Sequence, residues 1–331
     1  MRIFLFGTLL LSLVVPACGG EQLTIARLMQ YSGMADASAA VAVSSNLFVA
    51  ASDEDNVLRL YSSEHGGAPL NEFDFNDFLE LKGKSLEADL EGAARIGDRT
   101  FWIGSHGRNR NGKERLNRHR LFATDIRVIA GDVTLTAAGK PYKNLVEDLV
   151  REPKFQQFHL QEATGHAPKE KDALNIEGLA ATAEGHLLIG FRNPIPKGKA
   201  LIIPLLNPND VIDAKPARFG AAIQLDLKGR GIRDMAFYNG QYVISAGASG
   251  SGGNFQLYRW AGESAVPQPL TVEHLQGYSP EAIIIYPQFG LERIQILSDD
   301  GTRLEDGVPG KEVPDQAKRR FRSFWVEALK Q

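Results

Sequence analysis

The sequence predicts an all-β protein, a β-propeller of five four-stranded blades, from three observations. Residues 89–106 (DLEGAARIGDRTFWIGSH) align without a gap with residues 175–192 and with residues 36–53, and weaker copies begin near Arg233 and Glu281. Each copy starts with two short apolar strands joined by a tight turn, and most copies continue into two more. The last copy lacks an outer strand, and an unassigned strand precedes the first copy. Repeats of about 40–50 residues with four strands each are typical of propellers.

The individual strands are predicted from apolar runs bounded by Gly, Asn or Asp, the residues that short hairpin turns need. The outer strands are expected at 57–62 and 70–78 in the first copy, 200–205 and 219–227 in the third, and 255–260 and 269–275 in the fourth. The last copy provides strands at 282–286, 293–298 and 321–329. We expect residues 23–31, the unassigned N-terminal strand, to join this last blade and close the ring.

The stretch between the second and third copies is longer than the others, because 86 residues separate Asp89 from Asn175 (175 − 89). It contains strands expected at 121–126 and 133–137 and a helix expected over 144–158. We interpret residues from about 142 to 174 as a helical insertion in a single domain, 21–331. If part of this stretch is a blade instead, the propeller has six.

The N-terminal segment is predicted to direct export. Residues 1–17 contain Arg2 and then an apolar run too short to span a bilayer. The single cysteine, Cys18, follows V-P-A, which resembles a bacterial lipobox except at Pro16. Lipidation of Cys18 would give a cell-envelope lipoprotein, expected in the outer membrane. Ordinary cleavage before Cys18 would give a soluble periplasmic or secreted protein.

Composition limits the classes of partner. The chain has a net charge of −3, with 23% charged and 43% hydrophobic residues, as soluble globular proteins do. This balance gives no reason to expect nucleic-acid binding or membrane binding beyond the lipid anchor. We expect a monomer.

Acidic residues recur at the start of the innermost strand of each copy. The equivalent positions are Ser38, Glu91, Glu177, Arg233 and Glu281, with Asp36, Asp89, Asn175 and Asp234 close by. Carboxylates that converge on a propeller axis repel one another unless a cation lies between them, and Ca²⁺ prefers oxygen ligands. The candidate metal ligands are Glu91, Glu177, Glu281 and Asp89. Alternatively, the glutamates accept backbone hydrogen bonds and hold the blades together.

Basic residues are expected at the same rim. The connection at 107–120 contains six Lys or Arg and one acid, and the other long connections, 142–174, 193–199 and 246–254, leave from this end of the strands. Such a rim suits an anionic small molecule or a phosphoester, although a solvated charge run is an equal interpretation. No nucleophile elbow, H-E-x-x-H helix or Rossmann fingerprint occurs. The candidate catalytic residues are His106, Arg108, Arg192 and Arg233.

The motifs resemble two groups of proteins. Residues 89–96, 101–108 and 175–180, with S-D-D-G at 298–301, resemble the bacterial family catalogued as domain of unknown function 3616, which implies no reaction. The D-x-E-G and S-D-D-G signatures are more distantly similar to phytase-like or esterase-like propellers. That resemblance implies Ca²⁺-assisted phosphoester hydrolysis, with the three glutamates as metal ligands. The fourth copy departs from it, with Arg233 and Asp234 in place of Glu-Gly. The competing hypothesis is a non-enzymatic surface propeller that binds a protein or a glycan.

Overall fold

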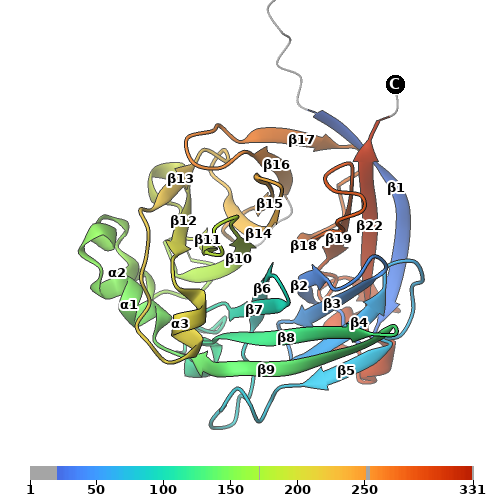
Figure 1. The fold of residues 1–331 in the computed structure, drawn as a ribbon, viewed down its shortest axis with the longest axis horizontal. Coiled ribbons are helices and arrows are strands. Elements are labelled where there is room, and N and C mark those ends of the chain that lie inside the picture. The colour runs from blue at the N-terminus through green and yellow to red at the C-terminus, as the bar shows by residue number, and fades with distance from the viewer. Residues whose placement is uncertain (1–20, 171, 251–253, 330–331) are drawn as a thin grey trace, which may run out of the picture.

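The computed structural model describes residues 21–170, 172–250 and 254–329, so the predicted export signal and Cys18 lie outside the described residues. The predicted all-β class is confirmed: strands make up most of the regular structure, and the sheets are arranged around a common centre like the blades of a propeller (Figure 1). Within the described ranges, no helix is long and apolar enough to cross a membrane.

Three of the sheets have four antiparallel strands each, in chain order from the centre outward. Their strands are β2 (Ala37–Ala42), β3 (Leu47–Ser52), β4 (Val57–Ser62) and β5 (Asn71–Asp74); β6 (Leu90–Ile96), β7 (Arg99–Gly104), β8 (Leu121–Ile129) and β9 (Asp132–Tyr142); and β10 (Asn175–Ala181), β11 (Leu187–Asn193), β12 (Ala200–Leu205) and β13 (Ile223–Leu225).

The remaining large sheet has eight strands and consists of two antiparallel runs of four. The first run is β14 (Gly231–Tyr238), β15 (Gln241–Gly247), β16 (Gln256–Trp260) and β17 (Gln268–Val272); the second is β18 (Pro280–Ile285), β19 (Arg293–Ser298), β22 (Arg320–Ala328) and β1 (Glu21–Ser32). Strand β1 pairs antiparallel with β22 and parallel with β17, which joins the two runs. The N-terminal strand is therefore the outer strand of the C-terminal run.

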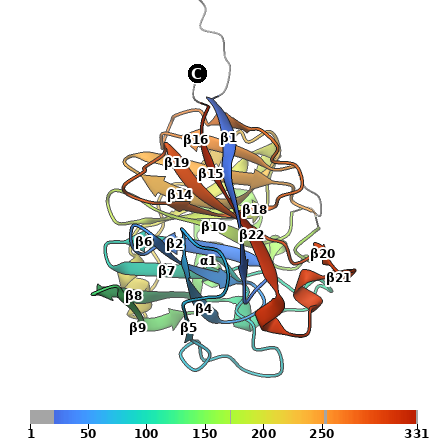
Figure 2. The same cartoon turned by 90° about the vertical axis from the view of Figure 1, so that its right-hand side faces the viewer.

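The innermost strands form a closed ring, in which β2, β6, β10, β14 and β18 each contact the next and β18 contacts β2 (Figure 1). All five run in the same direction. We call the end at which they begin the loop rim, because the long connections leave there, and the opposite end, with its short turns, the hairpin rim. Figure 2 shows the small hairpin of β20 (Leu304–Glu305) and β21 (Val308–Pro309), which lies in the long connection between β19 and β22 at the loop rim.

Helices are short and lie outside the ring. They are α1 (Leu145–Arg151), α2 (Leu160–Ala163) and α3 (Pro208–Ile212), with the 3-10 turns η1 (Leu116–Arg118), η2 (Pro153–Phe158), η3 (Pro196–Gly198), η4 (Gly310–Glu312) and η5 (Gln316–Lys318). The helix expected over 144–158 is split at Pro153. The proline side chain disfavours the helical conformation of the preceding residue, and Glu152 is accordingly extended (φ −72°, ψ 114°).

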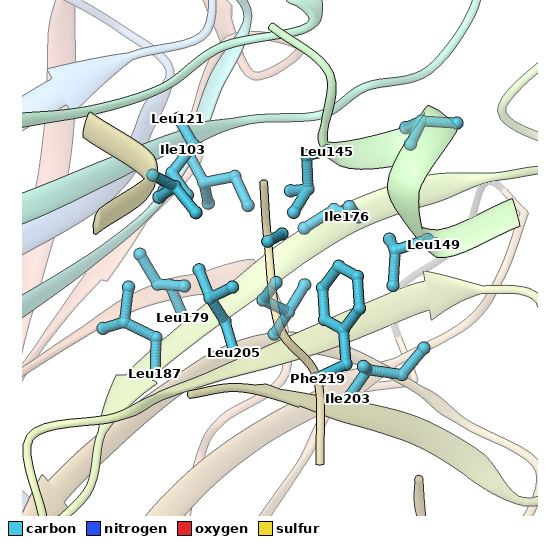
Figure 3. Close-up of a cluster of buried hydrophobic side chains, with 14 of the residues drawn as sticks. Ile103, Leu121, Leu145, Leu149, Ile176, Leu179, Leu187, Ile203, Leu205 and Phe219 are labelled. Atoms are coloured by element: carbon cyan, nitrogen blue, oxygen red, sulfur yellow. The ribbon is translucent and has the colours of Figure 1, made fainter. Parts of the chain in front are cut away.

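The largest hydrophobic cluster lies between the second and third sheets and beneath the helical insertion. Figure 3 shows Ile103 and Leu121 from one sheet facing Leu179 and Leu187 from the next, with Leu145 of α1 covering the same cluster. Each of these five side chains is fully buried. The insertion thus covers the interface between the second and third sheets. The innermost strands of these two sheets, β6 and β10, contain Glu91 and Glu177.

Candidate functional site

Each innermost strand contains a β-bulge at the same place in the repeat. The pairing register with the second strand shifts at Ser38, Glu91, Glu177, Arg233 and Glu281. These are the equivalent positions of the repeated motif, so the recurring glutamate is the extra residue of a bulge. A bulge turns a side chain away from the regular alternation and is common beside functional sites. It is the local feature that aims these side chains at the loop rim of the ring.

The glycine after the glutamate permits close approach of neighbouring inner strands. A Cβ placed on Gly92 would lie 2.9 Å from the carbonyl oxygen of Glu177, and one on Gly178 would lie 2.5 Å from the Ile232 side chain. Any larger residue would push the strands apart. In the E-G pair of the motif, the glutamate carboxylate is directed toward the loop rim, and the glycine allows neighbouring inner strands to pack closely.

Two of the predicted metal ligands are held by arginine. Arg233 Nε lies 2.8 Å from Glu177 Oε2, and its Nη2 donates to Glu281 Oε1. Arg192 Nη1 donates to the other oxygen of Glu177 at 2.8 Å. Burial raises the pKa of Glu281 to about 8, against the opposing effect of Arg233. Both carboxylates therefore already have a cationic partner, and Arg233 occupies the space between them.

Glu91 lies in a different environment. Among the described residues its carboxylate takes part in no ion pair, and its oxygen lies with those of Asp53 and Asp89, all within 4.8 Å of one another. Asp53 also belongs to a second group of the same size, with Asp36 and Glu54. The two triads come from the first and second sheets, and Asp53 joins them.

The electrostatics of this acidic cluster favour a bound cation. Asp53 Oδ1 is buried and has no hydrogen-bond partner in the described part of the chain. Burial, followed by repulsion from neighbouring carboxylates, raises the pKa of Asp36 to about 9 and holds the pKa values of Asp53 and Glu91 well above their usual range. Burial also raises the pKa of Asp89 to about 7, although Arg118 opposes the shift. A divalent cation would relieve this repulsion and satisfy the orphaned oxygen.

The S-D-D-G motif completes one side of the cluster. Asp299 repels Asp36 and contributes to the high pKa of that carboxyl. A Cβ on Gly301 would lie only 1.4 Å from Asp36 Oδ1, so this glycine leaves the space that the Asp36 carboxylate fills. In the same long connection, Lys311 Nζ lies 3.1 Å from Glu54 Oε1. Asp53, Glu54 and Lys311 are missing from the sequence-based candidates. Asp53 had one signal, its alignment with His106 and Arg192 at the end of the repeat.

The predicted basic rim is largely engaged in holding loops. Arg108 donates to the carbonyl oxygens of Thr164 (2.6 Å) and Gly112 (2.9 Å), and Arg192 donates to those of Ser249 (3.1 Å) and Gly250 (2.9 Å). The buried Arg120 donates to four carbonyl oxygens, and Arg118 pairs with Asp89 and Glu87. In contrast, Arg110, Lys113, Lys197 and Lys199 are exposed. The side chains of these four residues form no hydrogen bond or ion pair with the described part of the chain, so they are available to an anionic ligand.

His106 is buried and neutral. Burial lowers its pKa to about 3, and its Nδ1 lies 2.8 Å from the Gly104 carbonyl oxygen, so Nδ1–H donates there. Its Nε2 has no partner among the described residues. A cavity of about 660 Å³ lies elsewhere, along the ring axis at the hairpin rim, and its lining includes Ala93, Leu179 and Met235.

The fold and the site together define a propeller-like all-β protein with a partly buried acidic cluster at its loop rim. The chain belongs to the family described as "Protein of unknown function (DUF3616)", whose model matches residues 36–131 and 130–282. The predicted family is thereby confirmed. No curated protein matches the sequence.

Several solved structures align with most of this chain. Glutaminyl cyclase from Myxococcus xanthus is 12% identical, with 94% of this chain and 100% of that chain covered and a TM-score of 0.49. The PQQ-bound aldose sugar dehydrogenase from Streptomyces coelicolor is 9% identical (92% and 97% covered, TM-score 0.46). A putative oxidoreductase (glucose dehydrogenase) from Thermus thermophilus is 12% identical (90% and 99% covered, TM-score 0.42).

Proposed function

We propose that this protein binds a divalent cation, Ca²⁺, at the loop rim through Asp53, Asp89 and Glu91. The observation that carries the proposal is the buried Oδ1 of Asp53, which has no hydrogen-bond partner in the described part of the chain and belongs to a triad of carboxylates within 4.8 Å of one another. Hard oxygen ligands suit Ca²⁺, whose remaining positions would be filled by water or by a ligand. Glu177 and Glu281, which pair with Arg233, are assigned instead to holding the ring together.

We propose further that the bound cation serves a phosphoester ligand, as the distant resemblance to phytase-like propellers implies. A divalent cation in this position would polarise a phosphoryl oxygen and orient an attacking water. The chain itself supplies the three carboxylates that hold the cation and an exposed cationic side chain, Arg110, on a loop-rim connection. Arg110 takes part in no hydrogen bond or ion pair with the described residues, so it is available to bind an anionic oxygen.

The test is a Ca²⁺ titration followed by thermal unfolding and a phosphate-release assay over a panel of phosphoesters. We expect Ca²⁺ to raise the melting temperature of the wild-type protein and of Asp132→Asn, a control at an exposed aspartate that begins β9. We expect Asp53→Asn and Glu91→Gln to remove this shift, and with it any phosphate release. The absence of a Ca²⁺ shift in the wild-type protein would refute the cation site. A shift without turnover on any ester would refute the hydrolase.

A second candidate function is non-enzymatic recognition of a protein or glycan. It is favoured by the loop-rim arginines, because Arg108, Arg118, Arg120 and Arg192 are bonded to carbonyl oxygens and carboxylates of the protein itself. These bonds order the connections and leave fewer charges for a reacting phosphate. Under this hypothesis Ca²⁺ stabilises the rim, and Glu91→Gln weakens binding of the partner only as far as it loosens the loops.

Two architectural proposals accompany the function. We infer that each run of four strands is one blade, so that the propeller has five blades with β1 in the last.

We also propose that the chain is exported and anchored through a lipid on Cys18. Strand β1 starts at the outer edge of the ring, where Leu23 pairs with Ala328 at the end of β22 (Figure 2). An anchor just before β1 would therefore attach the propeller to the membrane at this edge. Incorporation of labelled palmitate that is lost in Cys18→Ser would support this proposal, and equal labelling of both would refute it.

A further inference from the structure

The ring of inner strands encloses a cavity at the end opposite the acidic cluster. Its volume is about 660 Å³, and small-molecule sites typically measure about 300–1,000 Å³. All five inner strands line it at equivalent positions of the repeat, and the lining residues nearest the loop rim are Ala40, Ala93, Leu179, Met235 and Ile283. Each of them lies two positions after a bulge residue. The cavity is therefore a feature of the ring itself and is separate from the proposed cation site.

This cavity has an apolar interior and a polar mouth. The five residues nearest the loop rim are buried, and those that follow them along the inner strands are mainly Ala, Val and Ile. The polar lining residues lie at the ends of the inner strands or in the turns after them; they are Ser44, Ser45, Arg95, Tyr238 and Gln288. Of these, Ser45 and Gln288 are exposed. A ligand would therefore place its apolar part inside the ring and its polar group at the hairpin rim.

The charge at the mouth comes from one side chain. Among the described residues that line the cavity, Arg95 is the only charged one. Its Nε donates to the Gly97 carbonyl oxygen at 2.8 Å, and its Nη1 donates to the carbonyl oxygens of Ala42 and Val43 at 3.0 and 3.2 Å. These bonds to the main chain hold the guanidinium in place at the cavity.

The third nitrogen of Arg95 is available to a ligand. Nη2 lies 3.6 Å from Asp98 Oδ1, beyond hydrogen-bond distance, and the Asp98 side chain is 92% exposed. An ion pair that is so exposed to water contributes little and is easily replaced. Arg95 therefore presents one donor nitrogen on a guanidinium whose other two nitrogens are already bonded.

We propose that this cavity binds an apolar monocarboxylate, with its hydrocarbon part inside the ring and its carboxylate against Arg95 Nη2. The sign of the charge selects the headgroup, because the described lining offers one cation and no acid. A guanidinium forms strong charge-assisted hydrogen bonds with a carboxylate. The inference goes beyond the proposed function, since it uses none of the carboxylates of the cation site and needs no metal.

The experiment is isothermal titration of the full chain with decanoate in EDTA. Decanol lacks the charge and butyrate lacks most of the hydrocarbon, so these two probes test the two ends of the cavity. We expect each of them to bind at least about tenfold more weakly than decanoate, because one forgoes a charge-assisted hydrogen bond and the other the burial of methylene groups. Equal affinity for decanoate and decanol, or no binding of decanoate, would overturn the proposal.

Arg95→Met should weaken decanoate binding by at least about tenfold and leave decanol binding unchanged. Arg127→Met is the matched control, because Arg127 is exposed, lies on β8 and is not part of the cavity lining. It should bind decanoate as the wild-type protein does. An equal loss in both variants would show a general effect of net charge and would overturn the proposal.

Two further variants keep the test decisive if Arg95→Met fails to fold. Asp98→Asn removes the exposed carboxylate that competes for Nη2, so it should bind decanoate about two- to fivefold more tightly, with decanol unchanged. Ala236→Phe, at a half-buried lining residue, should weaken decanoate and decanol alike, because its ring takes up space in the cavity. Unchanged decanoate affinity in either variant would place the ligand elsewhere and overturn the proposal. Ca²⁺ affinity should be the same in all these variants, so the cation site stands or falls separately.

Discussion

Arg233 and Glu177 form a buried ion pair between neighbouring inner strands, with Nε 2.8 Å from Oε2. Both side chains are bulge residues, and the same guanidinium also contacts Glu281 on the following strand. One arginine thus links three of the five inner strands at the loop rim. In the repeat Arg233 stands where other copies have a glutamate, and its positive charge balances the buried carboxylates of Glu177 and Glu281.

Removal of this arginine should destabilise the fold strongly. Arg233→Met leaves two buried carboxylates facing each other, and loss of one partner from a buried pair costs on the order of 3–5 kcal/mol. We expect a loss of that size in the free energy of unfolding measured with urea. Arg233→Met combined with Glu281→Gln should recover part of the loss, because fewer unpaired charges remain. Additive losses in the double variant would show that the two residues do not interact.

The glutamates at equivalent positions of the repeat should respond differently to the same substitution. Glu177→Gln removes an acceptor of Asn175, Arg192 and Arg233, so we expect a loss of about 1–3 kcal/mol in stability and an unchanged Ca²⁺ affinity. Glu91→Gln removes a carboxylate without a cationic partner among the described residues. Metal-free stability should stay the same or rise, and Ca²⁺ affinity should fall by at least about tenfold, the loss that even outer partners of a metal cause. Titration calorimetry and urea unfolding of the two variants measure the Ca²⁺ affinity and the stability. Equal changes in both variants would contradict the assignment of Glu177 to the scaffold and Glu91 to the cation site.

The architecture was predictable because it depends on local sequence patterns that recur along the chain. Apolar runs and Gly-containing turns placed β4 (Val57–Ser62), β12 (Ala200–Leu205) and β19 (Arg293–Ser298) at their observed bounds. The end strands were also recognisable, since one was missing at the C-terminus and one was spare at the N-terminus. These signals depend only on periodicity and on turn chemistry.

The candidate site was only partly predictable, because its members meet through long-range contacts. The motif identified Glu91 and Asp89, but nothing in the sequence indicated that Arg233 would pair with Glu177 and Glu281 and leave Glu91 alone. Lys311 lies in an irregular connection without a periodic pattern, and its ion pair with Glu54 spans most of the chain. The basic loop was visible as composition, whereas the bonds of Arg108 and Arg120 to main-chain oxygens depend on how the loop folds.

The glycine of the S-D-D-G motif should be needed for the cation site. A Cβ at Gly301 would overlap Asp36 Oδ1, at 1.4 Å, so Gly301→Ala must displace that carboxylate. We expect a loss of about 1–3 kcal/mol in stability from overpacking and a change in Ca²⁺ binding, since Asp36 and Asp53 belong to one triad. Gly250→Ala, where the added Cβ lies at an ordinary contact distance of 3.7 Å from the Lys169 oxygen, is the control and should alter neither. An unaffected melting curve and Ca²⁺ titration for Gly301→Ala would show that Asp36 has room to move.

The buried His106 should make the protein sensitive to mild acid. Its pKa in the folded chain is about 3, below the ordinary value of 6.5, because burial disfavours the charged ring. Between these two values the unfolded chain binds a proton that the folded chain does not, so the stabilising contribution is complete above pH 6.5 and is lost as the pH falls toward 3. The slope from one such group reaches about 1.4 kcal/mol per pH unit.

His106→Asn should remove this contribution to the loss of stability at acidic pH. Asparagine tolerates the positive φ of 55° at this position, and it does not titrate. We expect the free energy of unfolding of the variant to fall less steeply between about pH 6.5 and about pH 4.5 than that of the wild-type protein, measured by urea titration at each pH. His159→Asn is the matched control, because His159 also has a positive φ (52°) but is exposed, and its slope should equal that of the wild-type protein. If His106→Asn keeps the wild-type slope, the imidazole is protonated in the folded chain, and its free Nε2 would then have to donate to a partner such as a bound anion.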